Sequence, residues 1–246
     1  MKDIKPISST SATKQIAEQL KDAIISGELG RGDQLPTEYE LARMYGVSRP
    51  TIREAFKRLA AQNLIKSKRG PAGGTFVSSF GVNDASEMII SSTMLMLSLK
   101  SIDVEDVIDV RKMMQIQCCN LAIDHWSAEK EKEIEDALVA LSNPDLADNE
   151  FCDADVRLNR AIVNASGNAM LEYLMFGVIE SLVPVMNMII VYVRDRSVII
   201  GHYHDLKDAL FEKDKAAIEN SLKALMNYLS KKVKEAQKAR EQQAAQ

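Results

Sequence analysis

Three basic side chains at helical spacing have the clearest chemical potential in this sequence. Arg49, Arg53 and Lys57 recur every four residues, so a helix places them in one positive stripe. Such groups bind phosphate oxygens, and an arginine can also read guanine in the DNA major groove. The residues that fall on the opposite face are apolar: Ile52, Phe56 and Leu59. The pattern predicts a helix that packs with one face and meets DNA with the other.

The neighbouring residues supply the ends that two short helices need. Thr37 and Glu40 have the spacing of a capping box, which opens the first helix. Gly46 can take the left-handed conformation that ends it. Ser48 is a favourable N-cap for the second helix, and Pro50 falls in its first turn, where a missing N–H costs little. We therefore expect a helix-turn-helix over residues 37–56, with an ordinary helical hairpin as the alternative.

The segments on either side extend this motif to a winged helix. Upstream, apolar residues recur at helical spacing over residues 14–26, and Gly27 ends the pattern. Downstream, two short β-prone runs, residues 64–69 and 75–77, flank a glycine-rich turn and predict a hairpin. Positive charge lies beside its tip: Lys66, Lys68 and Arg69. Such a wing can reach the DNA backbone or the minor groove, which favours DNA binding over the plain hairpin.

These residues resemble the N-terminal domain of the GntR family of bacterial transcription regulators. The resemblance covers residues 10–78 and rests on LPTEYELARMYGVSRPTIREAFKRL followed by KRGPAGGTFV. It departs at Arg31, where the family usually has proline, and at Tyr39, where it usually has an arginine that contacts DNA. The resemblance and the basic stripe together predict DNA contacts from these residues: Thr37, Tyr39, Ser48, Arg49, Pro50, Thr51, Arg53, Lys57, Lys68, Arg69 and Gly70.

The charge of the chain is divided unequally. Its 246 residues, 46% of them hydrophobic, suffice for two domains with their own cores. Residues 1–80 hold 13 Lys and Arg against 8 Asp and Glu, a net charge of +5. The rest of the chain holds 18 against 27, a net charge of −9. A basic head is attracted to phosphate and an acidic body is not, so the division fits a small DNA reader joined to a domain with another task.

Residues 79–235 read as helices almost throughout, and they predict an antiparallel all-helical bundle of six to seven helices. The fold class is thus mainly α, a winged helix-turn-helix followed by a bundle. We expect residues 236–246 to be a charged tail at a fraying helix end. Apolar periodicity marks the helices at residues 85–99, 104–126, 129–141, 150–165, 169–194, 197–211 and 215–236.

One stretch of the bundle resembles the ligand-sensing domain of the FadR subgroup, of the FCD type. Asp155 precedes Asn159 by four residues, and an Ala-Ser-Gly-Asn turn follows at residues 165–168. The resemblance implies a dimeric helical sensor for small carboxylates, acyl-CoA esters or related metabolites. Many such sensors hold a divalent metal with one Asp and three His, and the ligand carboxylate completes the shell.

This chain lacks most of that ligand set. The second metal position carries Asn159, the third falls near Tyr203 and the fourth near Leu225. We therefore expect no cofactor and a sensor without metal; a bound divalent ion would take Asp155, Asn159 and His204. Without a cation, an anionic ligand needs Arg, Lys or backbone donors. The residues expected at the effector are Arg111, Asp155, Asn159, Arg157, Tyr203 and His204.

Methionines are frequent in the same helices, and flexible methionines fill irregular cores or line cavities for apolar ligands. They favour a lipid-like, acyl-CoA or other organic acid effector over a small hydroxy acid. The ones in question are Met94, Met96, Met113, Met114, Met170, Met175, Met186 and Met188.

The cysteines and the longest apolar run argue against an exported or membrane protein. Cys118, Cys119 and Cys152 have no CxxC spacing, and we expect them to be core residues in a reducing bacterial cytoplasm. Residues 170–193 are apolar but include Glu172 and Glu180, so we expect a buried, kinked helix and no membrane span.

The function that follows is a sequence-specific DNA-binding transcription regulator. We expect a homodimeric repressor that binds double-stranded DNA at a short inverted-repeat operator and is released or modulated by a small organic acid or acyl-CoA. An enzyme is not expected, because HExxH, ExxH, GxSxG and Gly-rich phosphate motifs are absent from the sequence. The alternatives are a ligand-independent dimeric DNA-binding protein and, more remotely, an enzyme fused to a DNA-binding head.

Overall fold

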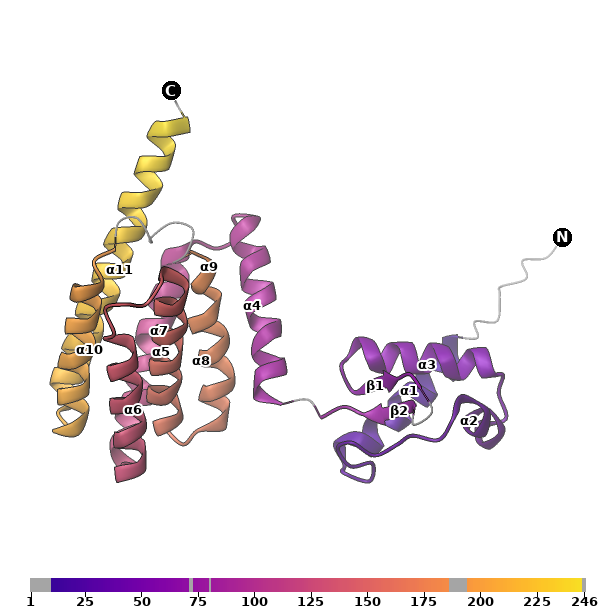
Figure 1. Ribbon diagram of the computed structural model, residues 1–246. Helices are drawn as coiled ribbons and strands as arrows, with labels where there is room; N and C mark the ends of the chain where they lie inside the picture. Colours follow the sequence, from indigo (N-terminus) through magenta and orange to yellow (C-terminus); the bar gives the residue numbers. More distant parts are fainter. Residues whose placement is uncertain (1–9, 71–72, 80, 186–193, 245–246) are drawn as a thin grey trace. The chain divides into compact units, whose positions relative to one another are not determined.

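A computed structural model describes residues 10–70, 73–79, 81–185 and 194–244, and the chain divides into two compact units (Figure 1). The first unit spans Met1–Gly81 and the second Val82–Gln246. The predicted class, a winged helix-turn-helix followed by a helical bundle, is confirmed.

The first unit has three helices and a two-stranded antiparallel sheet. Its elements are α1 (Thr10–Ile25), α2 (Glu38–Tyr45), α3 (Arg49–Ala61), β1 (Ile65–Lys68) and β2 (Gly74–Val77). The strand register pairs Ile65 with Val77 and Lys68 with Gly74, so the two strands form the predicted hairpin. Gln34, in the loop before α2, makes an isolated bridge to Phe76.

Local side-chain bonds fix where α2 and α3 begin and end. Thr37 N donates to Glu40 Oε2 (2.8 Å) and Glu40 N donates to Thr37 Oγ1 (3.3 Å), which is the predicted capping box. Gly46 ends α2 with φ 65°, a conformation in which a side chain would be strained. Ser48 Oγ then accepts from Thr51 N (3.4 Å), with Pro50 in the first turn of α3.

One hydrophobic core holds the first unit together. It joins Leu20 of α1, Leu41 of α2 and Ile52 of α3 to Ile65 and Val77 of the hairpin, and all five are at most 6% exposed. Since the wing and all three helices share this core, α3 is held by packing along its whole length.

The second unit is a bundle whose long helices match the seven predicted segments (Figure 1). Its main core contains buried side chains, from Val107 to Val233, of five helices: α5, α6, α7, α10 and α11. The elements are α4 (Val82–Ser98), α5 (Val104–Asp124), α6 (Ala128–Leu141), α7 (Asp148–Ala165), α8 (Ala169–Ser181), α9 (Val183–Val185), α10 (Arg196–Phe211) and α11 (Lys215–Ala244).

The segment over residues 169–194, expected to be one kinked helix, is interrupted after Ser181, and residues 186–193 lie outside the described part of the chain. The helix α8 ends at Ser181, and the single turn α9 follows after Leu182. Pro184 has no N–H to continue the ladder, and its ring clashes with the preceding turn. Ser181 Oγ also donates to Val178 O (2.8 Å). Met186 and Met188 lie outside the described residues. The helix α11 continues to Ala244, beyond the predicted end at Ala236.

Helix α4 packs closely on α8. A Cβ added at Gly177 would lie 2.5 Å from Ile89 Cβ, so only glycine permits this approach. Ser86 Oγ donates to Tyr173 O (3.1 Å), and Arg160 Nη1 of α7 donates to Asn83 Oδ1 (3.3 Å). These contacts attach the start of α4 to the bundle. Among the described residues, no helix is both long and apolar enough to cross a membrane.

Candidate DNA-binding surface and ligand pocket

The basic stripe of α3 lies on its exposed face. The side chains of Arg49, Arg53 and Lys57 are 59%, 53% and 65% exposed. The opposite face is buried, with Ile52 at 0% and Leu59 at 1%. Arg53 and Lys57 therefore project from a helix that cannot rotate without losing its core. Such a rigid, one-sided array of cations suits the major groove.

Glu38, the first residue of α2, holds the central arginine of this stripe. Arg53 donates from Nε to Glu38 Oε1 (3.0 Å) and from Nη2 to Glu38 Oε2 (2.8 Å), which is a bidentate pair. Arg49 Nη2 lies 3.9 Å from the same carboxylate. The hydrogen bond from Arg53 is the main cause that lowers the pKa of Glu38, so the carboxylate is charged at neutral pH. No local sequence pattern signals this pair, because its residues are 15 positions apart and lie on different helices.

The other residues expected at DNA surround the start of α3. Thr37, Ser48 and Pro50 are exposed, and Thr51 is partly exposed. The hydroxyl groups of Ser48 and Thr51 lie 2.8 Å apart. Lys57 is bonded to Glu54 (2.7 Å), an exposed pair that solvent weakens.

Tyr39 occupies the position where the resemblance implies an arginine, and a different arginine lies close to it. Tyr39 is 56% exposed, and the Arg43 guanidinium carbon lies 5.9 Å from its ring centroid. Arg43 is one turn further along α2, so this surface still carries a positive charge.

In the wing, the described residues keep their positive charge exposed. Lys68 Nζ lies 5.2 Å from the centroid of the Phe76 ring, which holds its long side chain against the hairpin. Arg69 follows it and is exposed, and Gly70 has φ 110°, which favours glycine. The tip residues 71–72 are outside the described residues.

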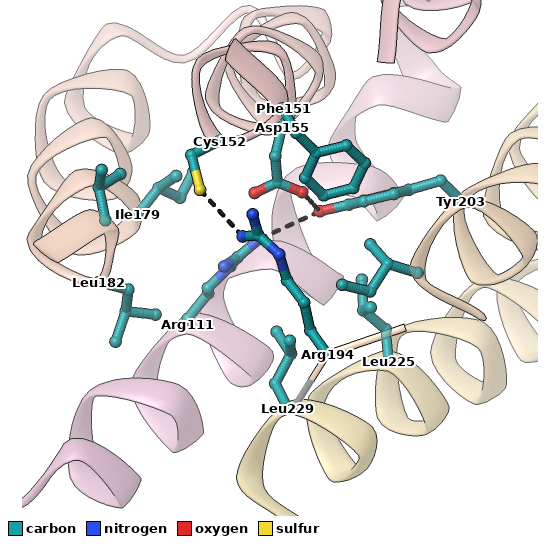
Figure 2. Close-up of a pocket in the computed structure, with 12 residues that line it drawn as sticks. Arg111, Phe151, Cys152, Asp155, Ile179, Leu182, Arg194, Tyr203, Leu225 and Leu229 are labelled. Atoms are coloured by element: carbon teal, nitrogen blue, oxygen red, sulfur yellow. Dashed lines mark hydrogen bonds between the residues drawn. The ribbon is translucent and has the colours of Figure 1, made fainter. Parts of the chain in front are cut away.

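The bundle encloses a small pocket between α5, α7, α8, α10 and α11 (Figure 2). Its free interior volume is about 20 Å³, which is room for about one water. The wall is mostly apolar and carries two guanidinium groups and one carboxylate. Its lining consists of Arg111, Phe151, Cys152, Asp155, Ile179, Leu182, Val183, Arg194, Ile199, Tyr203, Leu225 and Leu229.

A buried polar network forms one side of this pocket. Arg111, 2% exposed, donates from Nη2 to Asn159 Oδ1 (2.9 Å) and to the Tyr203 hydroxyl (3.4 Å). The Tyr203 hydroxyl donates to Asp155 Oδ1 (2.6 Å) and accepts from Asn159 Nδ2 (2.7 Å). Gln115 Nε2 donates to Asn159 Oδ1 (2.7 Å). Burial, with the nearby Asp155 charge, raises the pKa of Tyr203, so its phenol stays neutral.

Four of the six residues expected at the effector thus lie together: Arg111, Asp155, Asn159 and Tyr203. Arg157 is exposed and does not line the pocket, because two positions along α7 from Asp155 correspond to a rotation of about 200°. His204 is also exposed, since the buried face of α10 runs through Ile199, Tyr203 and Leu206. The structure therefore places neither Arg157 nor His204 at this pocket, where both were expected.

The donors around Asp155 do not fit a divalent metal. His204 points away, Tyr203 is a neutral phenol, and Arg111 places a positive charge 2.9 Å from the Asn159 oxygen. Leu225, at the fourth metal position, offers no donor. Over the residues that the structure describes, no group of three or more His, Cys, Asp or Glu side chains could hold a metal ion.

Two pocket residues and one member of the buried network carry no sequence signal for a ligand site. Gln115 is fully buried in the network, and Arg194 bonds to Cys152, whose thiol faces the pocket (Figure 2). Cys152 was expected to be core only. Cys118 and Cys119 are buried as expected, and burial raises the pKa of Cys118 to about 12.

The described methionines do not line this pocket, and Met175 follows the alternative of core packing. Met175 is buried, but it packs in a separate cluster beside Cys118 and does not line the pocket. Met96, Met113 and Met170 are 43%, 58% and 61% exposed. Leucine, isoleucine and phenylalanine form the apolar wall instead, and their positions follow from helix periodicity rather than from residue type.

The sequence matches two known families. The family described as "Bacterial regulatory proteins, gntR family" matches residues 12–77, and the one described as "FCD domain" matches residues 106–228. The HTH-type transcriptional regulator LutR of Bacillus subtilis (strain 168) is 34% identical over 153 residues, 62% of this chain and 67% of that protein. The uncharacterized HTH-type transcriptional regulator YcbG of the same organism is 29% identical over 219 residues, 87% of each chain.

A solved structure has a similar fold. Streptococcus agalactiae GntR aligns with a TM-score of 0.63 at 20% identity, and the match covers 88% of this chain and 98% of that one. At this identity the likeness concerns the fold alone.

Proposed function

Since the chain belongs to the GntR family of bacterial regulatory proteins, we propose that it binds an inverted-repeat operator as a homodimer under the control of a small-molecule effector. It joins the helix-turn-helix domain of that family to an FCD domain, so it is a transcription regulator and not an enzyme. The observation that carries the proposal is the stripe of Arg49, Arg53 and Lys57 on the exposed face of α3. A regulator of this kind acts in the bacterial cytoplasm.

In this proposal α3 enters the major groove and the wing follows the backbone. Arg49 and Arg53 are the residues for guanine contacts, since a bidentate arginine contributes about 1–3 kcal/mol of discrimination. Thr37, Tyr39, Ser48, Pro50 and Thr51 lie where the start of a recognition helix meets phosphate. Two heads that read one face of a duplex bind half-sites about one helical turn, roughly 34–36 Å, apart, and a two-fold dimer reads them as a short inverted repeat.

An apolar stripe on α4 supports the homodimer. Met88, Leu95 and Leu99 are 55%, 58% and 66% exposed and fall on one face of α4 and its C-terminal end. Large apolar side chains gathered on one face favour association, and a second copy of the same chain is the partner that an inverted repeat demands.

The enclosed pocket of the bundle is the proposed effector site. Arg111 and the Asp155–Tyr203 pair provide fixed polar groups beside an apolar wall, the usual composition of a ligand site. An effector that binds one arrangement of the dimer better shifts DNA affinity only by that difference, about 1–3 kcal/mol in typical cases. We expect the effector to release the protein from its operator, so that the protein without effector represses transcription.

A ligand-independent dimeric DNA-binding protein is the second candidate. The small free volume of the pocket, about 20 Å³, favours it, since an organic ligand must displace lining side chains. Thermal unfolding of the intact protein with organic acids and acyl-CoA esters separates the two. Binding at about a hundred times Kd adds about 2.7 kcal/mol of stability, whereas the second candidate shows no shift.

Sedimentation of the intact protein with DNA tests the operator proposal. The duplex is the tightest binder recovered from a random pool. We expect two chains on the full repeat, and much weaker binding of the same dimer to a duplex with a single half-site. Leu95→Glu should weaken the dimer without unfolding the chain, and the exposed Val139→Glu on α6 is the control. A single chain bound tightly to the full repeat would contradict the homodimer.

A further inference from the structure

The guanidinium of Arg194 is buried with one of its donors unused. Its side chain is 1% exposed. Nη1 donates to Cys152 Sγ (3.0 Å) and Nη2 donates to Asp148 Oδ1 (2.9 Å). The buried Nε–H finds no acceptor among the residues that the structure describes. Since an unpaired charged donor costs free energy, such a group indicates a place where a ligand supplies the acceptor.

The carboxylate nearest to Arg194 is shared with a second arginine. Asp148 Oδ1 also accepts from Arg196 Nη2 (2.5 Å), and its side chain is 54% exposed. The bonds from Arg196 and Arg194 lower the pKa of Asp148, so it carries its charge at neutral pH. Cys152 adds no negative charge, because burial raises the pKa of its thiol. One carboxylate thus serves two cations, and Arg194 lacks a counterion of its own.

Arg111 brings a second guanidinium to the same pocket (Figure 2). Its described partners are neutral oxygens, those of Gln115, Asn159 and Tyr203. Among the described lining residues Asp155 is the one carboxylate, and its Oδ1 already accepts from Tyr203. Two guanidinium groups against one carboxylate leave an excess of one positive charge inside an apolar wall.

We propose that Arg194 and Arg111 form a metal-independent site for a single carboxylate on a compact apolar acid. A carboxylate oxygen accepts the free Nε–H of Arg194, and its charge neutralises the excess of the pocket. The apolar body of the acid packs on Leu182, Leu225 and Leu229. This inference rests on the proposed function, because it names the ligand class of the effector pocket.

The chemistry of the pocket favours a compact organic acid over a long-chain acid or an acyl-CoA ester. A guanidinium can neutralise and hydrogen-bond a carboxylate without a metal ion, so a chelator should leave binding unchanged. The thioester of an acyl-CoA carries no charge to meet Arg194, and its phosphates far exceed one positive charge. A free volume of about 20 Å³ also favours a compact acid over a long chain.

The experiment uses the full-length protein dialysed against EDTA. Acetate, butyrate and benzoate are the probes, and acetamide, butyramide and benzamide are their neutral isosteres. Calorimetric titration and the midpoint of thermal unfolding report binding. We expect at least one of the carboxylates to bind, and its amide to bind about ten- to a hundredfold more weakly, since a charged hydrogen bond is lost.

Two arginine variants separate ligand binding from structural support. Arg194→Gln should weaken carboxylate binding about ten- to a hundredfold. Arg196→Gln is the matched control, because Arg196 bonds to the same Asp148 but does not line the pocket, and its binding should match wild type. Arg194→Lys keeps the charge and serves if Arg194→Gln does not fold; it should retain part of the affinity.

Three results would overturn the inference: no carboxylate binds, the amide binds as tightly as its acid, or binding appears only after Zn²⁺ or Mn²⁺ is added. Equal losses in Arg194→Gln and Arg196→Gln would assign Arg194 a structural role instead. Operator binding by the same preparations keeps the two proposals apart. A protein that binds its operator but no carboxylate fails this inference alone, and one that binds no operator fails the proposed function.

Discussion

Arg53 of α3 is bound through both Nε and Nη2 to Glu38 of α2, at 3.0 and 2.8 Å. The helix proposed to read DNA thus has its central arginine oriented by a carboxylate of the preceding helix. Glu38 fixes the direction of the guanidinium, and it also cancels part of the charge that attracts phosphate. These two effects act in opposite directions on specific and non-specific DNA binding.

Replacing Glu38 by Gln should separate these effects. We expect Glu38→Gln to bind non-specific DNA more tightly, because a negative charge beside Arg53 and Arg49 is removed. The ratio of operator to non-specific affinity should fall, because Arg53 is no longer oriented. Fluorescence anisotropy over a series of salt concentrations measures both. Glu54→Gln, which frees the exposed Lys57 instead, is the control and should change the ratio less; an unchanged ratio in Glu38→Gln would refute the orienting role.

The same pair gives the stability of the protein a pH dependence. The bond from Arg53 lowers the pKa of Glu38 below 4.5 in the folded state. A lowered carboxyl pKa stabilises the fold above the unfolded pKa, and the contribution is lost as pH falls through the folded pKa. Wild type should therefore be slightly more stable than Glu38→Gln at pH 7, and the two should converge in acid as pH falls through the lowered pKa of Glu38. A difference that persists there would be inconsistent with this assignment.

The Tyr203 hydroxyl links three polar side chains of the pocket. Tyr203→Phe should destabilise the second unit by about 1–3 kcal/mol, because Asp155 Oδ1 and Asn159 Nδ2 each lose a buried hydrogen bond. Denaturant unfolding measures the loss. His204→Ala, at the next position but exposed, should change stability by less than about 0.5 kcal/mol. A larger loss in His204→Ala than in Tyr203→Phe would reverse the assigned orientation of α10.

The helix-turn-helix could be predicted from sequence because its signals are local. Thr37 and Glu40 cap each other across three residues, Ser48 Oγ accepts from Thr51 N three residues on, and Gly46 sets its own backbone. No distant part of the chain is needed to read them. The Glu38–Arg53 pair spans 15 residues and two helices, so only the packing of α2 on α3 reveals it.

The pocket was predictable only where periodicity reaches it. Ile199, Leu206 and Leu210 mark the buried face of α10 and place Tyr203 inside and His204 outside. The same periodicity in the sequence could therefore have shown that His204 does not face the pocket. Arg194 and Cys152 are 42 residues apart and have no motif spacing. Arg194 also precedes the first turn of α10, where helical periodicity gives no direction. Its burial follows from tertiary packing alone.

The first unit has its own core and supplies a test of the dimer. Residues 1–81 alone should bind one half-site, and affinity for the full repeat should be about a hundredfold or more below that of the intact protein. Titration of the two proteins against one labelled duplex makes the comparison, with circular dichroism to verify folding. Equal affinity would contradict a dimer held by the second unit.

The most direct test of the account is selection of bound duplexes from a random pool by the intact protein, with Arg49→Ala run in parallel. Arg49 is exposed and only weakly held by Glu38, so its loss should leave the fold intact. We predict an enriched short inverted repeat with wild type and no enrichment with the variant. Failure of wild type to enrich any sequence, or enrichment of the same repeat by Arg49→Ala, would contradict sequence-specific recognition through α3.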